Sequence, residues 1–137
     1  MTGAPANGFG TTLGPSALGP PSFRIDDELN PGTTAVFSVH GELDLHEAPE
    51  LQGRITAAID RGATLIVVDL TDVTFIDSMA LGVLLAAVNR LRPTGGQLRL
   101  VVPNPSIRRI FEISLLDQVF TLDVSRDEAL AAAEGPS

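Results

Sequence analysis

An aspartate and a serine, Asp77 and Ser78, stand side by side between two apolar stretches of this sequence. The segment 64–70 (TLIVVDL) precedes them and the segment 81–88 follows them. Either residue can cap the first turn of a helix, and the serine can also act as a nucleophile or accept a phosphoryl group. The residue types alone leave these three uses open.

The nucleophile hypothesis is the least favoured of the three. Ser78 is not part of a G-x-S-x-G elbow, and no histidine lies near it in the sequence. The fold would have to bring His40 or His46 within hydrogen-bond distance of the Ser78 hydroxyl. We therefore expect no catalysis by this chain.

Metal binding is also disfavoured. His40 and His46 flank the stretch 41–44 (GELD), but they do not form the helical i, i+4 pair of many zinc sites. The chain has no cysteine, which excludes a thiolate zinc site, thiol catalysis and disulfides. We expect a structural or surface role for both histidines, and neither a metal nor a cofactor.

Two elements must position Asp77 and Ser78. The segment 64–70 is almost continuously apolar, which predicts a central strand buried on both faces. The segment 79–91 predicts a helix that ends before Pro93. The pair then lies at the carboxyl edge of the sheet, where open α/β sheets bind ligands and where a helix N-terminus favours a phosphate.

The remaining segments continue this alternation of strands and helices. Short strands are predicted at 23–28, 33–40, 97–102 and 119–123, and helices at 47–61, 105–114 and 125–134. The turn NPGT joins the first two strands into a hairpin, and Gly62, Asn104 and Ser125 are expected caps. The pattern predicts an α/β fold that consists of a mixed, largely parallel sheet and about four helices.

Composition separates a domain from its flanks. Among the 137 residues, 1–22 are rich in Gly, Pro and Ala and carry no charged side chain, so we expect them to be disordered. Residues 133–137 should fray, which leaves one domain at 23–132. No basic residue precedes Arg24 and no apolar run approaches 20 residues, so we expect neither a secretory signal nor membrane insertion, and a cytoplasmic location.

The charge balance restricts the partners. The formal net charge is −8, and all nine basic residues are arginines. Nucleic acid repels such a chain, and no basic or aromatic cluster offsets the repulsion. The partner should be a protein or a small ligand, and the free chain should be a monomer.

The predicted helix 79–91 has an unusual outer face. Five apolar residues form the stripe expected to face the sheet: Leu81, Leu84, Leu85, Val88 and Leu91. The other face holds Met79, Gly82, Val83, Ala86, Ala87, Asn89 and Arg90. Only Arg90 is charged there, so this face either docks a protein partner or is covered by another helix of the same chain.

Three stretches carry a resemblance to a known family. They are HGELDLHEAPEL (40–51), DLTDVTFIDSMALGVLL (69–85) and SIRRIFEISLLDQVF (106–120). In order and spacing they resemble the STAS domain, and more closely its single-domain bacterial members, the anti-sigma-factor antagonists. The resemblance covers about 23–130 of the chain.

The resemblance implies a partner switch. In that family an anti-sigma factor that is also a serine kinase phosphorylates the serine after the strand's aspartate, and a PP2C-type phosphatase removes the phosphate. The unphosphorylated antagonist binds the anti-sigma factor and thereby releases sigma. Ser78 would be the acceptor, while Asp77 and Asp44 would match the family's acidic positions at the same edge.

The weakly polar outer face of the helix 79–91, together with the two acidic positions that the resemblance implies, gives the expected partner surface. It consists of Asp44, Asp77, Met79, Gly82, Val83, Ala86 and Arg90. Thr74 is a second, less favoured phosphorylation candidate in what we expect to be the same loop. A non-switching STAS subunit of a lipid-transport or stress-signalling complex is the alternative function.

The sequence departs from the family pattern at two places. Met79-Ala80 replaces the usual small residue and glycine after the serine, which could alter kinase access or partner choice. Leu115 replaces the glycine of a later turn, and we expect the turn to tolerate it. The pair Arg108-Arg109 should belong to a solvated helix face.

Overall fold

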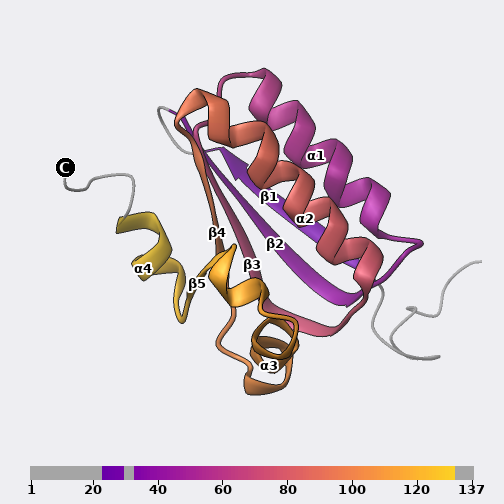
Figure 1. Cartoon of the computed structure of the whole chain (residues 1–137). Coiled ribbons are helices and arrows are strands. Elements are labelled where there is room, and N and C mark those ends of the chain that lie inside the picture. The colour runs from indigo at the N-terminus through magenta and orange to yellow at the C-terminus, as the bar shows by residue number, and fades with distance from the viewer. Residues whose placement is uncertain (1–22, 30–32, 132–137) are drawn as a thin grey trace, which may run out of the picture.

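One mixed sheet organises the residues that the computed structural model describes, 23–29 and 33–131 (Figure 1). Its strands are β1 (Arg24–Leu29), β2 (Thr34–Leu43), β3 (Leu65–Ile76), β4 (Gln97–Val101) and β5 (Thr121–Asp123). The helices of the described residues are α1 (Ala48–Asp60), α2 (Ser78–Leu91), α3 (Pro105–Ile113) and α4 (Arg126–Leu130), with short 3₁₀ turns η2 (Arg92–Thr94) and η3 (Leu116–Gln118). The predictions for 1–22 and 133–137, and most of the NPGT turn, lie outside the described residues.

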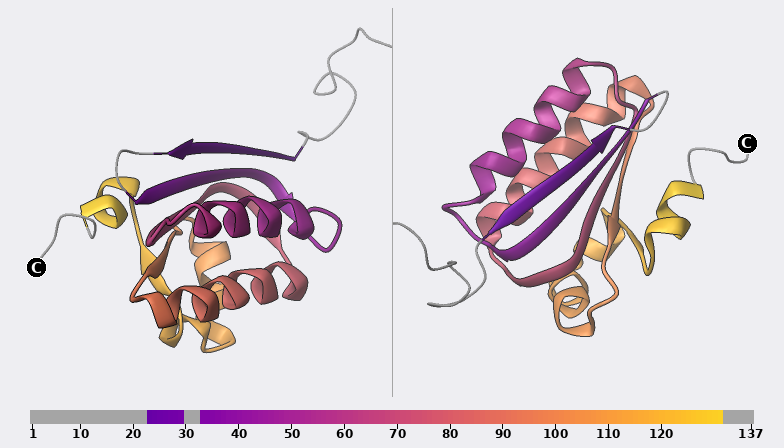
Figure 2. Two further views of the ribbon diagram at one scale, coloured as in Figure 1. Left: turned by 90° about the horizontal axis from the view of Figure 1, so that it is seen from above. Right: turned by 180° about the vertical axis from the view of Figure 1, so that it is seen from behind.

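The strands lie side by side in sequence order, β1-β2-β3-β4-β5. β1 pairs antiparallel with β2, and the other pairs are parallel. Successive right-handed crossovers place α1 and α2 on the same face of the sheet (Figures 1 and 2). The predicted α/β fold with a mixed, largely parallel sheet and an antiparallel first pair is confirmed.

Part of the opposite face of the sheet, over β3, β4 and β5, is covered by α4. Ala129 of α4 packs with Val67 and Val101 in a second, smaller core. These valines alternate along their strands with Val68 and Leu100, which belong to the main core beneath α1 and α2. β3 is therefore buried on both faces, as its apolar run predicts.

β3 continues to Ile76, past the predicted end at Leu70. Its second half pairs with the second half of β2, as far as Leu43 opposite Ile76. Because this pairing uses backbone groups, the polar side chains of the second half do not interrupt it. The prediction that Thr74 lies in a loop was wrong, since Thr74 is a residue of β3.

Two irregularities bend the paired ends of β2 and β3. The register shifts between Ser38 and His40 and again between Gly41 and Glu42. Gly41 has a φ of 99°, a backbone conformation that residues with a side chain rarely adopt. Such bulges re-aim the residues that follow them, here the loop from Asp44 to α1.

Replacing Gly41 with alanine should therefore lower the free energy of unfolding by about 1–2 kcal/mol, the usual cost of a left-handed backbone at a residue with a side chain. Urea unfolding followed by circular dichroism measures this change. Gly53→Ala is the matched control, because a Cβ at Gly53 of α1 meets nothing within 4 Å. That variant should be more stable by about 0.5–1 kcal/mol. Equal shifts in the two variants would contradict the role given to Gly41.

The buried face of α2 differs from the predicted stripe. Its buried residues are Ala80, Leu84, Ala87 and Leu91. Leu81 and Val88 are only partly buried, and Leu85 is exposed. α2 packs against α1 as well as against the sheet. Its buried face therefore includes the small residue Ala87, which was predicted to face outward.

The predicted helix caps are present. Asn104 accepts a hydrogen bond from the backbone two residues on, at 2.9 Å, and Gly62 has a φ of 100° just after α1. Ser125 accepts from Glu128 N at 3.1 Å. Ser125 and Glu128 do not form a reciprocal capping box, because the Glu128 carboxylate accepts from Val124 N instead of Ser125 N.

Leu115 begins η3 with a left-handed backbone, at φ 62° and ψ 15°. Its N–H donates to the Glu112 carbonyl, and its own carbonyl accepts from Gln118 N. The turn forms with leucine in place of glycine, but a left-handed backbone costs a leucine about 1–2 kcal/mol.

Candidate partner-docking site

Asp77 joins three elements at the carboxyl edge of the sheet. It is the N-cap of α2, and its Oδ1 accepts from Ala80 N at 3.1 Å. Its Oδ2 accepts from Leu45 N at 2.9 Å, and its own N–H donates to the Leu43 carbonyl at 3.3 Å. The carboxylate thus fastens the loop after β2 to the start of α2.

Ser78 is the first residue of α2 and is exposed to solvent. Because Asp77 supplies the cap, the Ser78 hydroxyl is not needed for it. The helix N-terminus carries a partial positive charge, which favours an anion in the first turn. Ser78 is therefore accessible, dispensable for the helix, and placed where a phosphate would be tolerated.

Asp44 lies in the loop that Asp77 holds. Its Oδ1 accepts from His46 N at 3.0 Å and from Glu47 N at 3.2 Å, which shapes the turn into α1. Since Leu45 is bonded to Asp77, the structure brings Asp44 and Asp77 to one edge, as predicted from the resemblance. Both carboxylates also hold backbone N–H groups, a structural role that the sequence did not indicate for Asp44.

Removing the Asp77 side chain should destabilise this edge of the sheet. Asp77→Ala should lower the free energy of unfolding by about 1–3 kcal/mol, because one cap and one loop hydrogen bond are lost together. Asp77→Asn should cost less, since its amide oxygen can still accept one of the two bonds. Chemical denaturation of both variants tests this. Asp117→Ala, at an exposed site, should stay within about 0.5 kcal/mol of wild type. A similarly small effect of Asp77→Ala would contradict the fastening role.

Three residues that neighbour Asp77, in the sequence or through a hydrogen bond, have large apolar side chains that are exposed to solvent. Leu45 is 52% exposed, Phe75 47% and Met79 58%. Phe75 and Met79 lie two residues before and after Asp77, and Leu45 is hydrogen-bonded to it. Leu45 and Phe75 were missed by the sequence analysis, although Phe75 precedes the buried Ile76 and strand alternation could have placed it outward.

The outer face of α2 is shared between solvent and α1. Gly82 and Ala86 are exposed, and Val83 is partly buried. Val83, Ala86 and Arg90 line a shallow hollow of about 40 Å³ against α1. The Arg90 guanidinium binds the Asp60 carboxylate of α1 at 2.9 Å.

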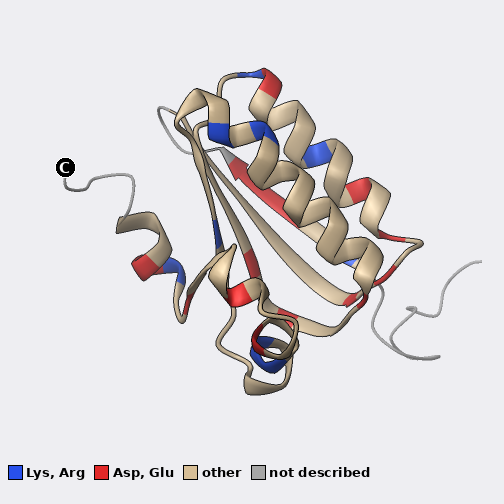
Figure 3. Ribbon diagram, viewed as in Figure 1, with Lys and Arg blue, Asp and Glu red and all other residues tan. Residues whose placement is uncertain are grey.

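The alternative that another helix of the chain covers this face holds in part. α1 adjoins the side that carries Val83 and Arg90, whereas Met79 and Gly82 do not line the hollow. Figure 3 shows how few charges α2 carries compared with α1. The weakly polar part of α2 next to Ser78 is available to a partner.

The histidines do not form a serine-hydrolase arrangement in the described part of the chain. The ring of His40 lies between two carboxylates, with Nε2 3.3 Å from Asp26 and Nδ1 3.1 Å from Asp72. No hydrogen bond joins Ser78 to a histidine within residues 23–29 and 33–131. The Arg24 guanidinium, with a smaller contribution from His40, holds the pKa of Asp26 below its ordinary value.

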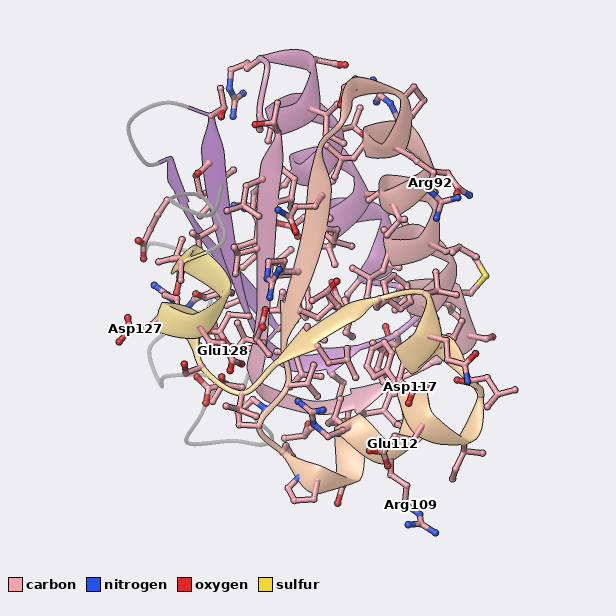
Figure 4. All side chains as sticks on the ribbon, turned by 60° about the vertical axis from the view of Figure 1, so that its left-hand side comes forward. Arg92, Arg109, Glu112, Asp117, Asp127 and Glu128 are labelled. Carbon is pink, nitrogen blue, oxygen red and sulfur yellow. The ribbon has the colours of Figure 1, made fainter. Side chains whose placement is uncertain are left out.

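The two arginines predicted to be solvated differ from each other. Arg108 is partly buried and donates to the Val102 carbonyl at 3.1 Å and to the Asp123 carbonyl at 3.4 Å. The prediction was wrong for Arg108, because the chain after β4 and the end of β5 lie beside this side of α3. Arg109 does point away from the protein (Figure 4).

Residues 23–29 and 33–131 contain no group of three or more His, Asp or Glu side chains arranged to hold a metal ion. No helix within those ranges is both long and apolar enough to span a membrane.

Comparison with known proteins places this geometry in context. The STAS domain matches residues 24–129. The anti-sigma F factor antagonist of Lysinibacillus sphaericus is 31% identical over 103 residues, which cover 74% of this chain and 87% of that protein.

Solved structures agree with this match. An anti-sigma factor antagonist from Mycobacterium paratuberculosis is 32% identical, with a TM-score of 0.75 over 83% of this chain and 96% of that one. The Bacillus cell fate determinant SpoIIAA, solved in its phosphorylated form, is 28% identical, with a TM-score of 0.66 over 80% of this chain and 99% of that one.

Proposed function

This chain belongs to the STAS domain family, and on that premise we propose that it is an anti-sigma-factor antagonist switched by phosphorylation of Ser78. One observation carries the proposal: an exposed serine that the helix does not need stands at the start of α2, directly after the capping Asp77. The antagonists at 31–32% identity support the same role.

In the unphosphorylated state the partner contacts the edge around Ser78. Met79 and Gly82 offer an apolar, sterically open surface on α2, and Asp44 and Asp77 hold the neighbouring loop in place. The partner is an anti-sigma factor with serine-kinase activity, and binding it frees sigma in the cytoplasm. Val83, Ala86 and Arg90 belong to the margin of this surface beside α1.

Phosphorylation changes the surface without changing the fold. A phosphoserine adds about −1.5 to −2 charges at neutral pH, and the start of α2 accommodates them. With Asp44 and Asp77 nearby, the edge becomes strongly negative and hydrated, so an apolar or acidic partner surface dissociates. A PP2C-type phosphatase restores the binding state. The chain itself contributes no catalysis and no cofactor.

The test is the intact mass of the purified protein after incubation with host lysate, ATP and magnesium. One added phosphoryl group that is absent from Ser78→Ala supports the proposal. An unmodified wild type, in a lysate with active kinases, favours a non-switching STAS subunit. Modification that persists in Ser78→Ala but not in Thr74→Ala moves the acceptor to β3.

A second test separates docking from stability at Gly82. Gly82→Ala should raise the free energy of unfolding by about 0.5–1 kcal/mol, because glycine is a poor helix former and the added Cβ meets nothing within 4 Å. The same methyl group should weaken binding to the purified serine-kinase anti-sigma factor of the host, measured by calorimetry without ATP. Unchanged affinity in a stabilised variant would remove Gly82 from the docking surface.

A further inference from the structure

Met79, the residue after Ser78, carries a sulfur atom in a side chain that is 58% exposed. Helical side chains lean over the turn that precedes them, but α2 begins at Ser78 and has no preceding turn to cover Met79. Gly82, one turn further along the helix, leaves its neighbourhood open, since a Cβ built there meets nothing within 4 Å. The side chain of Met79 is therefore accessible to a small solute.

Sulfur is otherwise nearly absent from this chain. It has no cysteine, and its two methionines are Met1 and Met79. It also has no tyrosine and no tryptophan, which stronger oxidants attack. Among residues 23–29 and 33–131, Met79 is therefore the one side chain that a peroxide oxidises readily, and no thiol there competes with it.

A partner that reaches Ser78 must also cover Met79. The Cα atoms of the two residues are about 3.8 Å apart across one peptide bond. A kinase has to bring the Ser78 hydroxyl to about 3 Å from the phosphorus that it attacks, so the flanking side chain lies inside the contact. The flexible thioether of Met79 adapts to an apolar partner surface. A strongly polar group at the same place would be buried without a hydrogen-bond partner.

We propose that Met79 is a site of reversible oxidation by hydroperoxides, and that its sulfoxide weakens docking at Ser78. A lone pair of Met79 Sδ attacks one peroxide oxygen, the O–O bond breaks and an S–O bond forms. The sulfur loses two electrons, and hydrogen peroxide is reduced to water. A sulfoxide reductase reverses the step with two thiols, which become a disulfide while the oxygen leaves as water. Hydrogen peroxide is neutral, so the net charge of −8 does not repel it.

The effect on docking rests on the proposed function, whereas the oxidation itself does not. The sulfoxide oxygen is a strong hydrogen-bond acceptor in a contact that otherwise buries an apolar side chain. The affinity for the anti-sigma factor should therefore fall roughly ten- to hundredfold. Peroxide would then release the partner at the same edge as phosphorylation does, in response to a different signal.

Peptide mass mapping of the full chain after treatment with hydrogen peroxide tests the site. One oxygen atom should appear at Met79 at a rate within about fivefold of that of N-acetylmethionine amide, and methionine sulfoxide reductases should remove it. Because Met79 is exposed, the midpoint of thermal unfolding should shift by no more than about 2 °C. A slower reaction, or an oxidised chain that unfolds at a clearly lower temperature, would overturn the proposal.

Calorimetry against the purified serine-kinase anti-sigma factor of the host, without ATP, tests the effect on docking. The antagonist is oxidised first and the peroxide is removed, so that the partner is not oxidised. The oxidised wild type should bind roughly ten- to hundredfold more weakly than the reduced wild type, and reductase treatment should restore binding. Met79→Gln, which carries a polar amide oxygen near the position of the sulfoxide, should bind about tenfold more weakly than wild type without any peroxide.

Met79→Leu is the matched control, because leucine is apolar and does not react with peroxide, while Met1 is still present. Whatever its own affinity, that affinity should be the same before and after peroxide treatment. A loss in this variant as large as the loss in wild type would place the effect outside Met79 and overturn the proposal.

The outcomes separate this proposal from the proposed function. If reduced and oxidised wild type bind equally well, the proposed function stands and the oxidation switch fails. If the reduced chain neither binds the anti-sigma factor nor is phosphorylated at Ser78 in host lysate, the proposed function fails. The oxidation site at Met79 then stands or falls on the peptide mapping alone.

Discussion

Stoichiometric phosphorylation of Ser78 should weaken binding to the serine-kinase anti-sigma factor about a hundredfold. At an effective dielectric near 20, two unit charges about 6 Å apart repel by roughly 2–3 kcal/mol. A partner carboxylate facing the phosphate, with Asp44 and Asp77 already at the edge, would meet at least one such repulsion. About 3 kcal/mol corresponds to roughly a hundredfold change in dissociation constant.

Calorimetric titration of the two forms, without ATP, measures this ratio. Ser78→Glu adds only one charge and should weaken binding about tenfold. Ser106→Glu is the matched control, because Ser106 is also an exposed serine in the first turn of a helix, α3. That variant should bind like wild type. Equal losses for both glutamates would mean that net charge alone, and not the position of Ser78, controls binding.

The largest effect on stability should come from Asp123, at the end of β5. Its side chain is 4% exposed and accepts two hydrogen bonds from Arg99 of β4, from Nε at 2.8 Å and from Nη2 at 2.9 Å. These bonds raise the pKa of Arg99 above its ordinary value. The Asp123 carbonyl also accepts from Val102 N, at 2.8 Å. The pair therefore fastens the last strand to the sheet.

Asp123→Ala should lower the free energy of unfolding by about 2–3 kcal/mol. Breaking a buried pair usually costs about 3–5 kcal/mol, because one charge is left without its partner, but Arg99 is partly exposed and regains some water. Urea unfolding at neutral pH measures the loss. Asp60→Ala removes the exposed pair with Arg90 and should cost only about 0–1 kcal/mol. Similar losses in the two variants would contradict the burial argument.

Much of the fold follows from local patterns in the sequence. The continuous apolar run of 64–70 predicted a strand buried on both faces, and β3 is buried by α1 and α2 on one side and by α4 on the other. The caps at Asn104 and Ser125 were also predictable, because a cap depends on residues two or three positions apart.

Other features depend on contacts between distant parts of the chain and could not be predicted locally. The second half of β3 is a strand because β2 lies beside it, although its own side chains are largely polar. Ala87 of α2 is buried and Leu85 is exposed because α1 lies on one flank of that helix. Arg108 is partly buried because the end of β5 comes next to it.

The candidate site shows the same division. The sequence by itself determined that Asp77 and Ser78 stand at a strand-to-helix junction, since strand and helix are each encoded by neighbouring residues. The structure decided that Asp77, and not Ser78, is the cap. Only the tertiary structure decided that Asp77 also holds Leu45, 32 residues away, and that the side chains of Leu45, Phe75 and Met79 are exposed. Such contacts arise from the parallel pairing of β2 with β3, which brings the carboxyl ends of both strands to one edge.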